Sequence, residues 1–361
     1  MPNWTQSMRQ TFEYYTVDPN TWRDKNIVRT VKTCTIDRDL SAETLGSATI
    51  DITESLGETY IRVYLITVQN GVKEKFPLGT FLIQTPSTSF DGKISNISID
   101  AYTPLLELKE SPTPIGYFVR KDANIMEIAY RLTREHARAP VVAPVVETVT
   151  DDNRKDTTLF SDFIADTEDT WCSFLTDLIS NAKYTYDLDE MGRILFAPKQ
   201  DIASLQPVWT YDDGNSSILY PEFTTDCDLY GIPNVVEVIY SNGNDLYQSV
   251  AKNTNVNSPV SIPSRGREIV YRVTDPSLIG NPTNSQIDEY AEQVLESMST
   301  LEYTVTYTHG YCPVRIGDCV RLNYAKAGIN NVKAKVISQS IKCEPGTPVT
   351  ETATFTTNLW R

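Results

Sequence analysis

The segment Tyr60-Ile-Arg-Val-Tyr-Leu-Ile-Thr-Val68 alternates in polarity, is rich in β-branched residues and is followed by Asn70-Gly71. Asn-Gly is typical of a type I′ hairpin turn, because both positions require a positive φ. The pattern then continues through Val72 to Phe76, a break at Pro77-Leu78-Gly79, Thr80 to Thr88, a tight turn at Asp91-Gly92, and Lys93 to Tyr102. The sequence therefore predicts an antiparallel meander over residues 60–102.

The last predicted strand indicates which face of the meander is buried. Its apolar residues Ile97, Ile99 and Ala101 alternate with polar residues, and successive side chains of a strand point to opposite faces. We expect one face to belong to a core and the other to meet water. Nothing in this segment resembles an active site.

Composition bounds the class of protein. The chain has 361 residues, of which 40% are hydrophobic and 22% charged, as in folded globular proteins with two or three domains. We find no apolar segment as long as the about 18 residues needed to span a bilayer. Residues 1–7 do not have the pattern of a signal peptide. We therefore expect no membrane insertion, and we expect the protein to be made and assembled in a cytoplasm.

The negative charge is spread along the chain. The net charge of −15 divides into −3 for residues 1–107, −6 for 108–206 and −6 for 207–361. Binding to a phosphate backbone needs clustered Lys and Arg, and the sequence has no such cluster. The composition argues against sequence-specific nucleic-acid binding and allows a surface that DNA passes without adhering.

Six cysteines occur without any Cys-x-x-Cys pair. This spacing suits neither a zinc site nor a disulfide framework, and free cysteine packs as a small apolar residue. We expect buried, reduced thiols at Cys34, Cys172, Cys227, Cys312, Cys319 and Cys343.

The N-terminal part contains further β-structure. The first 26 residues are polar and aromatic, with Trp4 and Trp22 among them, and are expected to dock on their own fold or on a neighbour. Ile27 to Ile36 opens the first sheet, Asp37 to Gly46 is a polar connection, and Ser47 to Thr53 is a short strand.

Residues 108–206 form an α+β insertion in this prediction. A helix is expected from about Ala123 to Arg138, followed by an extended stretch over 139–149 and a polar loop over 151–156. A second helix starts near Trp171, because apolar residues recur there at i, i+3, i+4, i+7 and i+8. A hairpin follows, with strands Tyr184 to Leu188 and Arg193 to Ala197 joined by a turn at 189–192.

Strands return after Pro207. Pro233 to Tyr240 and Asp245 to Lys252 form a predicted hairpin around Asn242-Gly243, a loop covers 253–264, and a helix starts at Ser285 with Asp288 as its capping-box partner. The final strands are Glu302 to His309, Asp318 to Tyr324, Val332 to Lys342 and Thr350 to Thr357. The segment Ile316-Gly-Asp-Cys-Val-Arg-Leu resembles Leu78-Gly-Thr-Phe-Leu-Ile in layout, which suggests one β-module used twice.

The search for chemistry gives no catalytic, cofactor-binding or metal-binding residues. A nucleophilic triad needs a histidine base, but His136 is expected at a helix C-terminus and His309 in a turn. Asp187-x-Asp189 favours a hairpin turn over a calcium loop, because the loop's twelfth position is Pro198. Residues 147–190 hold 12 carboxylates and 3 basic groups, which leaves a glycosidase-like carboxylate pair as an alternative.

Three segments together resemble the baseplate hub proteins of phage tails. They are Cys34-Thr-Ile-Asp-Arg-Asp-Leu40, Phe76-Pro-Leu-Gly-Thr-Phe-Leu-Ile-Gln-Thr-Pro86, and Asp166-Thr-Glu-Asp-Thr-Trp-Cys-Ser-Phe-Leu175 with the hairpin after it. The resemblance implies an α+β, mainly β fold with two tail-tube-like antiparallel β-barrel or sandwich domains. It places these at 1–107 and at 207–245 with 301–361, and smaller peripheral domains at 108–206 and 246–300.

The resemblance also implies an assembly. Three chains would form a homotrimer, a pseudo-sixfold ring that adapts the hexameric tail tube to a threefold spike and leaves a channel for DNA during genome ejection. Partners would be the tail tube or distal tail protein, the central spike or tip protein, baseplate wedge proteins and, as a further candidate, the tape-measure protein. The location would be the virion tail. The sequence shows no enzymatic extension after the last strand, so cell-wall digestion is expected from a separate protein.

Two other functions remain open from the sequence. One is a tail-associated cell-wall hydrolase, which would use carboxylates of the acidic stretch. The other is a receptor-binding or carbohydrate-binding tail-tip protein, which the 20 tyrosines allow.

Overall fold

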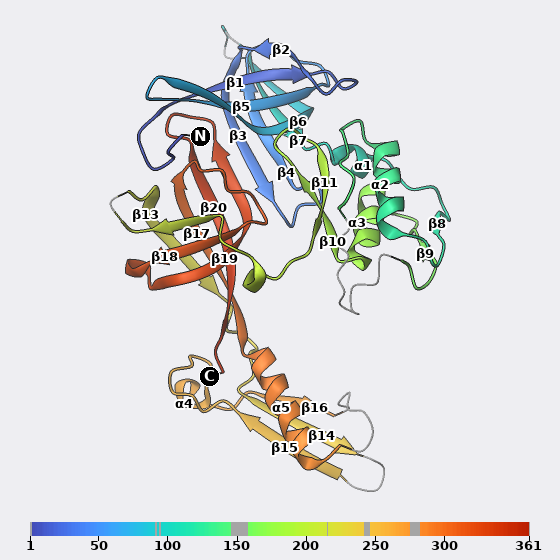
Figure 1. The fold of residues 1–361 in the computed structure, drawn as a ribbon, viewed down its shortest axis with the longest axis vertical. Helices are drawn as coiled ribbons and strands as arrows, with labels where there is room; N and C mark the ends of the chain where they lie inside the picture. Colours follow the sequence, from blue (N-terminus) through green and yellow to red (C-terminus); the bar gives the residue numbers. More distant parts are fainter. Residues whose placement is uncertain are drawn as a thin grey trace. The chain divides into compact units, whose positions relative to one another are not determined.

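The structure is a computed structural model that describes residues 2–90, 92–93, 95–145, 158–214, 216–241, 246–274 and 282–360. The chain divides into two compact units. The first comprises Met1–Glu222 and Tyr307–Thr352, and the second comprises Phe223–Thr306 and Ala353–Arg361. The fold is α+β and mainly β, as predicted (Figure 1).

Strands from both ends of the chain share one large sheet. Its order is β13-β17-β20-β19-β3-β4-β7-β6-β5-β1-β2, with β18 beside β19 and β12 beside β18. The N-terminal strands are β1 (Arg9–Val17), β2 (Asp24–Val28), β3 (Val31–Asp39), β4 (Gly46–Ile52), β5 (Tyr60–Gln69), β6 (Val72–Phe90) and β7 (Ser95–Tyr102). The later strands are β12 (Trp209–Asp212), β13 (Leu219–Cys227), β17 (Thr300–Gly310), β18 (Cys319–Tyr324), β19 (Ile329–Lys342) and β20 (Pro348–Asn358).

The two sets of strands meet at a seam formed by β3 and β19. The strands are antiparallel, and their register runs from Ser338 opposite Asp39 to Lys342 opposite Thr35. Ile36 and Ile341 face each other in this register and are both fully buried. Apolar packing therefore reinforces the hydrogen bonds of the seam.

The predicted meander is confirmed. β5 pairs with β6 and β6 with β7, both antiparallel, and Asn70 and Gly71 have φ angles of 51° and 80°. Ile97, Ile99 and Ala101 are buried. Asp91 of the second predicted turn lies outside the described residues.

The predicted break at Pro77-Leu78-Gly79 is wrong, because β6 runs through it. The register with β5 passes from Tyr64 opposite Pro77 to Val63 opposite Gly79, so Leu78 is the extra residue of a β-bulge. β7 pairs with β6 from Leu82 onward, so Pro77 lies beyond that ladder and its missing N–H removes no hydrogen bond to β7.

The N-terminal segment is more ordered than the sequence indicated. Strand β1, which the sequence analysis missed, pairs with β5 from Arg9 to Val17. The aromatic segment thus docks on its own fold, where Trp4 packs edge-on against Phe76 and Tyr311. The expected strand Ile27 to Ile36 is two strands, β2 and β3, and β3 extends into the expected polar connection.

The insertion forms its own hydrophobic core. It contains α1 (Leu106–Glu110), β8 (Phe118–Val119), α2 (Ile125–His136), β9 (Phe163–Ile164), α3 (Trp171–Asn181), β10 (Tyr184–Leu188) and β11 (Ile194–Pro198). Asn124 caps α2, and Thr170 with Ser173 forms a capping box on α3. The apolar faces of both helices are buried together with Tyr186 and Ile194 of the hairpin. Both predicted helices and the hairpin are confirmed, and the predicted loop 151–156 lies outside the described residues.

The second unit packs one helix on a small sheet. Its elements are β14 (Val235–Ser241), β15 (Leu246–Lys252), α4 (Ile262–Arg265), β16 (Val270–Val273) and α5 (Asn284–Met298), and the sheet order is β15-β14-β16. Ile287, Ala291 and Leu295 of α5 pack on Val236 and Val238. Figure 1 shows α5 lying along this small sheet. The hairpin strands are confirmed, and their turn at Asn242-Gly243 lies outside the described residues.

Two smaller expectations change. The predicted cap at Ser285 is wrong: Thr283 caps α5 and Gln286 completes the capping box. Part of the predicted loop 253–264 begins helix α4. Short 3-10 turns η2 (Ile202–Ser204) and η3 (Ala325–Ala327) complete the described elements, and none of these helices is long and apolar enough to cross a membrane.

Candidate functional site

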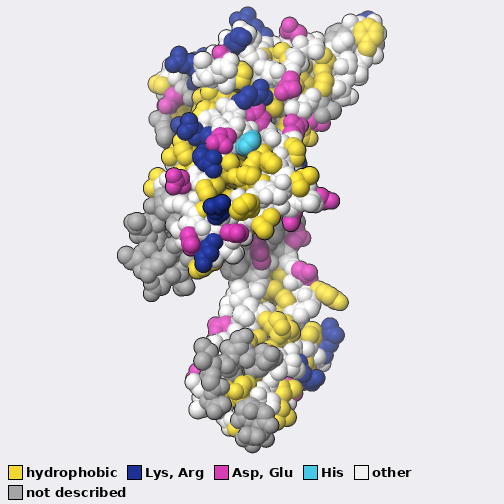
Figure 2. Space-filling view, turned by 90° about the vertical axis from the view of Figure 1, so that its right-hand side faces the viewer, with side chains coloured by type: hydrophobic (Ala, Val, Ile, Leu, Met, Phe, Trp, Pro, Cys, Tyr) yellow, Lys and Arg dark blue, Asp and Glu magenta, His cyan; other side chains and the backbone are white. Residues whose placement is uncertain are grey.

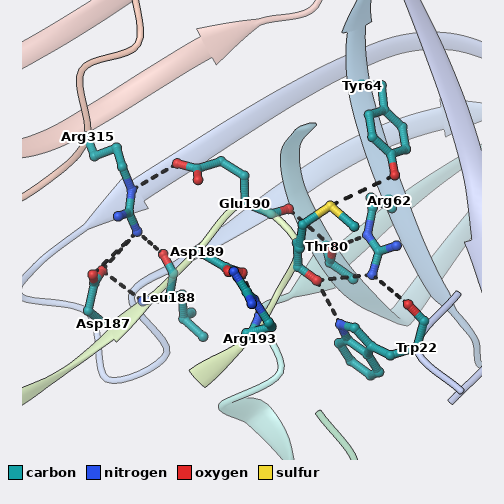
Figure 3. A network of polar contacts seen from close by, with 11 residues as sticks. Trp22, Arg62, Tyr64, Thr80, Asp187, Leu188, Asp189, Glu190, Arg193 and Arg315 are labelled. Carbon is teal, nitrogen blue, oxygen red and sulfur yellow. Dashed lines mark hydrogen bonds and ion pairs between the residues drawn. The ribbon is translucent and has the colours of Figure 1, made fainter. Parts of the chain in front are cut away.

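The turn of hairpin β10–β11 is held by polar contacts within the first unit (Figure 3). Arg62 of β5 is almost fully buried, at 1% exposure. Its guanidinium donates from Nε to Thr80 Oγ1 at 2.8 Å, from Nη1 to Asp24 Oδ1 at 2.7 Å, and from Nη2 to the Met191 carbonyl oxygen at 3.0 Å. A buried guanidinium is tolerated when its donors are matched in this way.

Aromatic side chains complete this side of the contact. Trp22 Nε1 donates to the same Met191 carbonyl at 2.7 Å, and Tyr64 donates its hydroxyl to Asp24 Oδ2 at 2.8 Å. Burial, followed by the contact with Asp24, raises the pKa of Tyr64 to about 12. Tyr64 therefore stays a donor at neutral pH. Two donors on one carbonyl fix the turn against the first sheet.

Glycine is required at the end of this turn. Gly192 has φ 75°, and a Cβ there would lie 2.7 Å from Thr80 Cβ. Positive φ disfavours other residues, and the contact leaves no space for a side chain. The turn backbone can approach β6 only because residue 192 is glycine.

Arg315 binds the opposite side of the same turn. Its Nε lies 2.9 Å from Glu190 Oε1, its Nη2 donates to Asp187 Oδ1 at 3.2 Å, and it also donates to the Leu188 carbonyl (Figure 3). Burial raises the pKa of Asp187, with Arg315 acting against this rise. For Arg315, burial acts against the charge, but Glu190 and Asp187 raise its pKa. The hairpin is thus bound by Arg62 from the N-terminal strands and by Arg315 from the C-terminal segment.

A chain of polar contacts continues across the seam. Arg38 of β3 donates to the Leu78 carbonyl at 2.6 Å and to Gln339 Oε1 at 3.3 Å. Gln339 of β19 donates from Nε2 to Glu351 Oε2 at 2.7 Å. The network therefore reaches from the bulge in β6 to strand β20.

His309 lies at the end of this series of polar contacts. The prediction that His309 is a turn residue is wrong. It belongs to β17 and is fully buried. Its Nε2 lies 3.4 Å from Glu351 Oε2 and 3.1 Å from the Tyr211 hydroxyl, and its Nδ1 lies 2.7 Å from the Gly310 carbonyl oxygen. Burial acts to lower the pKa of His309, but hydrogen bonds to Cys312 and Glu351 outweigh it and raise the pKa to about 10.

Glu351 accepts hydrogen bonds at the centre of this cluster. Tyr307 and Gln339 both donate to its fully buried carboxyl group. Burial raises the pKa of Tyr307 and of Tyr211, so both hydroxyls remain protonated donors. The sequence signal for this cluster is weak, because its members are spread over residues 211–351.

Several candidate residues take structural roles. His136 ends α2 as predicted, and its ring stacks on Trp171 at 4.3 Å between centroids. In the acidic stretch, Asp187, Asp189 and Glu190 are ion-paired with arginines, and residues 146–157 lie outside the described part. All six cysteines are free, four of them buried and Cys227 and Cys343 half-buried. Within the described ranges, no group of three or more His, Cys, Asp or Glu side chains could hold a metal ion.

Similarity to known proteins is visible at the level of structure. No family model and no curated protein matches the sequence. A tail protein from Neisseria meningitidis MC58 has a TM-score of 0.60 and 13% identity, over 97% of this chain and 98% of that one. The 43 kDa tail protein of prophage MuSo2 from Shewanella oneidensis has a TM-score of 0.58 and 12% identity, over 95% of this chain and 98% of that one.

A third similar structure is larger. A chain of the Francisella PdpA–VgrG complex has a TM-score of 0.54 and 9% identity, over 98% of this chain and 53% of that one. The first two similarities cover both chains nearly end to end. The resemblance predicted from the sequence is therefore confirmed for the fold: this chain has the fold of these two tail proteins.

Proposed function

We propose that the protein is the baseplate hub of a phage tail. In this proposal three chains form a ring of six similar β-modules, which adapts a hexameric tail tube to a threefold spike or tip. The observation that carries the proposal is the seam between β3 and β19. It joins the N-terminal and C-terminal strands of one chain side by side, as neighbouring subunits of a ring would be joined.

The outer strands of the sheet supply the contacts between chains in this proposal. The main run of paired strands ends at β2 and β13, and a side branch through β18 ends at β12. Both β2 and β13 are largely exposed. Unpaired strand edges favour pairing with another chain. We propose that β2 of one chain meets β13 of the next, which closes the ring and protects both edges.

The proposed ring also gives the net charge a role and suggests the partners of the protein. A spread net charge of −15 would let DNA pass through the ring without adhering, because like charges repel. The proposed partners are the tail tube or distal tail protein, the spike or tip protein, the tape-measure protein and wedge proteins. The similarity to a chain of the PdpA–VgrG complex supports a role within a larger assembly.

A non-enzymatic role is part of the proposal. Three carboxylates of the acidic stretch form ion pairs with Arg315 or Arg193, namely Asp187, Asp189 and Glu190. These contacts favour a role in holding the hairpin in place over a role in hydrolysis. Cell-wall cleavage would then belong to another protein.

The test is the solution mass of the purified chain over a range of concentrations. We expect a trimer by light scattering. Ile27→Asp should weaken it, because Ile27 lies exposed on edge strand β2. Val72→Asp is the matched control, since Val72 is exposed beside the β5–β6 turn. A dimer, a hexamer or a monomer at every concentration would contradict the proposal.

A further inference from the structure

Two cysteines face each other where the seam ends. Cys34 belongs to β3, and Cys343 directly follows β19. The register places Ile341 opposite Ile36 and Lys342 opposite Thr35, so the next pair is Cys343 and Cys34. The Cys343 N–H donates to the Cys34 carbonyl oxygen at 2.9 Å. Directly opposed residues of antiparallel strands have Cβ atoms about 4.5–5.5 Å apart.

The two side chains belong to opposed residues and differ in access. Cys34 is buried, at 3% exposure, whereas Cys343 is half-buried. Both are free thiols in the structure. Other cysteines have different neighbours: Cys312 Sγ lies 3.2 Å from the Tyr211 hydroxyl, and Cys172 Sγ donates to the Glu43 carbonyl oxygen at 3.6 Å.

We propose that Cys34 and Cys343 are a redox site that closes to a disulfide on exposure to a peroxide. The bond would link residues far apart in the chain and lock β3 to β19. A Cα separation of about 5.5 Å, typical of hydrogen-bonded strand pairs, lies within the range that disulfides span. The two Cβ atoms must approach each other to about 4 Å as the bond forms. The sequence spacing of the cysteines could not indicate this pair, because the strand register creates it.

The reaction balances in two steps. Cys343 Sγ attacks one oxygen of hydrogen peroxide, the O–O bond breaks, and the thiol proton leaves with the other oxygen as water. Cys34 Sγ then attacks the sulfur of the resulting sulfenic acid, the S–S bond forms, and the S–O bond breaks to release a second water. Two thiols are oxidised and one peroxide is reduced. Cys343 reacts first because it is the more accessible thiol.

The surroundings of Cys34 also affect the second step. The hydrogen bond with Cys343, followed by burial, raises the pKa of the Cys34 thiol. Cys34 is therefore protected from direct oxidation, because the thiolate is the reactive form. It reacts once the sulfenic acid has formed beside it.

The timing of oxidation rests on the proposed function. A reducing cytoplasm keeps thiols free during assembly, and the environment outside the cell is oxidising. The disulfide would then strengthen the seam in the released particle. The thiol chemistry itself can be tested on the purified chain, so its failure would leave the proposed assembly unaffected.

The experiment treats the purified, folded chain with hydrogen peroxide and counts free thiols after denaturation. We expect the count to fall from six to four and to return to six with dithiothreitol. Trypsin without reductant should release peptide 33–38 bound to peptide 343–361, lighter than their sum by two hydrogen atoms. The Tm of the oxidised chain should rise by several degrees, because a disulfide restricts the unfolded chain.

Two variants complete the test. Cys343→Ala should abolish both the linked peptide and the rise in Tm, whereas Cys227→Ala, at another half-buried cysteine, should keep both. If Cys343→Ala does not fold, the test is whether the linked peptide forms in the wild-type chain and in Cys227→Ala. Its absence from both would overturn the proposal. Six thiols after peroxide treatment, a sulfinic acid at Cys343 without a linked peptide, or a disulfide to another cysteine would each overturn the proposal.

Discussion

Arg62 Nη2 donates a hydrogen bond to the Met191 carbonyl oxygen at 3.0 Å, although 129 residues separate the two in sequence. Arg62 belongs to the first set of strands and Met191 to the hairpin turn of the insertion. Arg315 binds the same turn from the C-terminal segment. The hairpin is therefore a common attachment point for both β-halves of the chain within the first unit.

Arg62→Met is expected to lower the free energy of unfolding by about 3 kcal/mol, because it removes three hydrogen bonds of a buried guanidinium and leaves the Asp24 carboxylate without its positively charged partner. Urea denaturation would measure this loss. Arg193→Met is the control: the Arg193 side chain is half exposed in its pair with Asp189, and such pairs contribute about 0–1 kcal/mol. Equal effects of the two substitutions would contradict the role assigned to Arg62.

Gly192→Ala is expected to destabilise the chain more than Gly266→Ala. Both residues have positive φ, but a Cβ at 192 would lie 2.7 Å from Thr80 Cβ, whereas a Cβ at 266 has no described heavy atom within 4 Å. Gly266→Ala should cost about 1 kcal/mol for backbone conformation, and Gly192→Ala should add the steric contact. Thermal unfolding of both variants checks this, and a smaller loss for Gly192→Ala would refute it.

The contacts of this turn show what the sequence could predict. Asp189 to Gly192 has the composition of a turn, so the hairpin was predictable. Its attachment to Arg62 and Arg315 was not, because a sequence pattern gives local conformation and leaves open which distant segments meet. The bulge at Leu78 was missed for a related reason: Pro77 ends a strand by local rules, and only the pairing of β6 with its neighbours shows that it is tolerated.

Stability is expected to fall as pH rises from about 6.5 to 9. The pKa of His309 is raised to about 10 in the folded chain, so its protonated form stabilises the fold fully below the unfolded value near 6.5, and this contribution is lost as pH approaches 10. The loss over this window is on the order of 3 kcal/mol, since one pKa unit corresponds to about 1.4 kcal/mol.

The matched variants for this prediction are His309→Gln and His136→Gln. Urea denaturation at pH 6.5, 7.5 and 9 should show a shallower decline for His309→Gln, and the wild-type decline for His136→Gln. If His309→Gln retains the full pH dependence, another group causes it and the assignment to His309 fails.

Thr283→Ala is expected to weaken the first turn of α5 by about 1 kcal/mol, because Thr283 accepts a hydrogen bond from the Gln286 N–H. Ser285→Ala should have little effect. Amide hydrogen exchange at Gln286 and Ile287 measures the difference. Faster exchange in Ser285→Ala than in Thr283→Ala would support the cap predicted from sequence instead.

The helix cap and His309 show two limits of sequence analysis. Ser285 with Asp288 and Thr283 with Gln286 both fit a capping-box pattern, so composition alone could not choose between them. His309 precedes a glycine, which favours a turn, but the strand continues to Gly310 and Glu351 supplies a buried partner. The predicted strands and helices depended on local periodicity and were mostly found, whereas the polar network depends on tertiary contacts.

Electron microscopy of the assembled tail tests the central claim most directly. Viewed along the tail axis, the layer formed by this chain should contain three copies, with six similar β-modules around an open centre and the β3–β19 seam alternating with contacts between β2 and β13. Six copies in that layer, a closed centre, or two β-halves that do not occupy alternating positions would contradict the account.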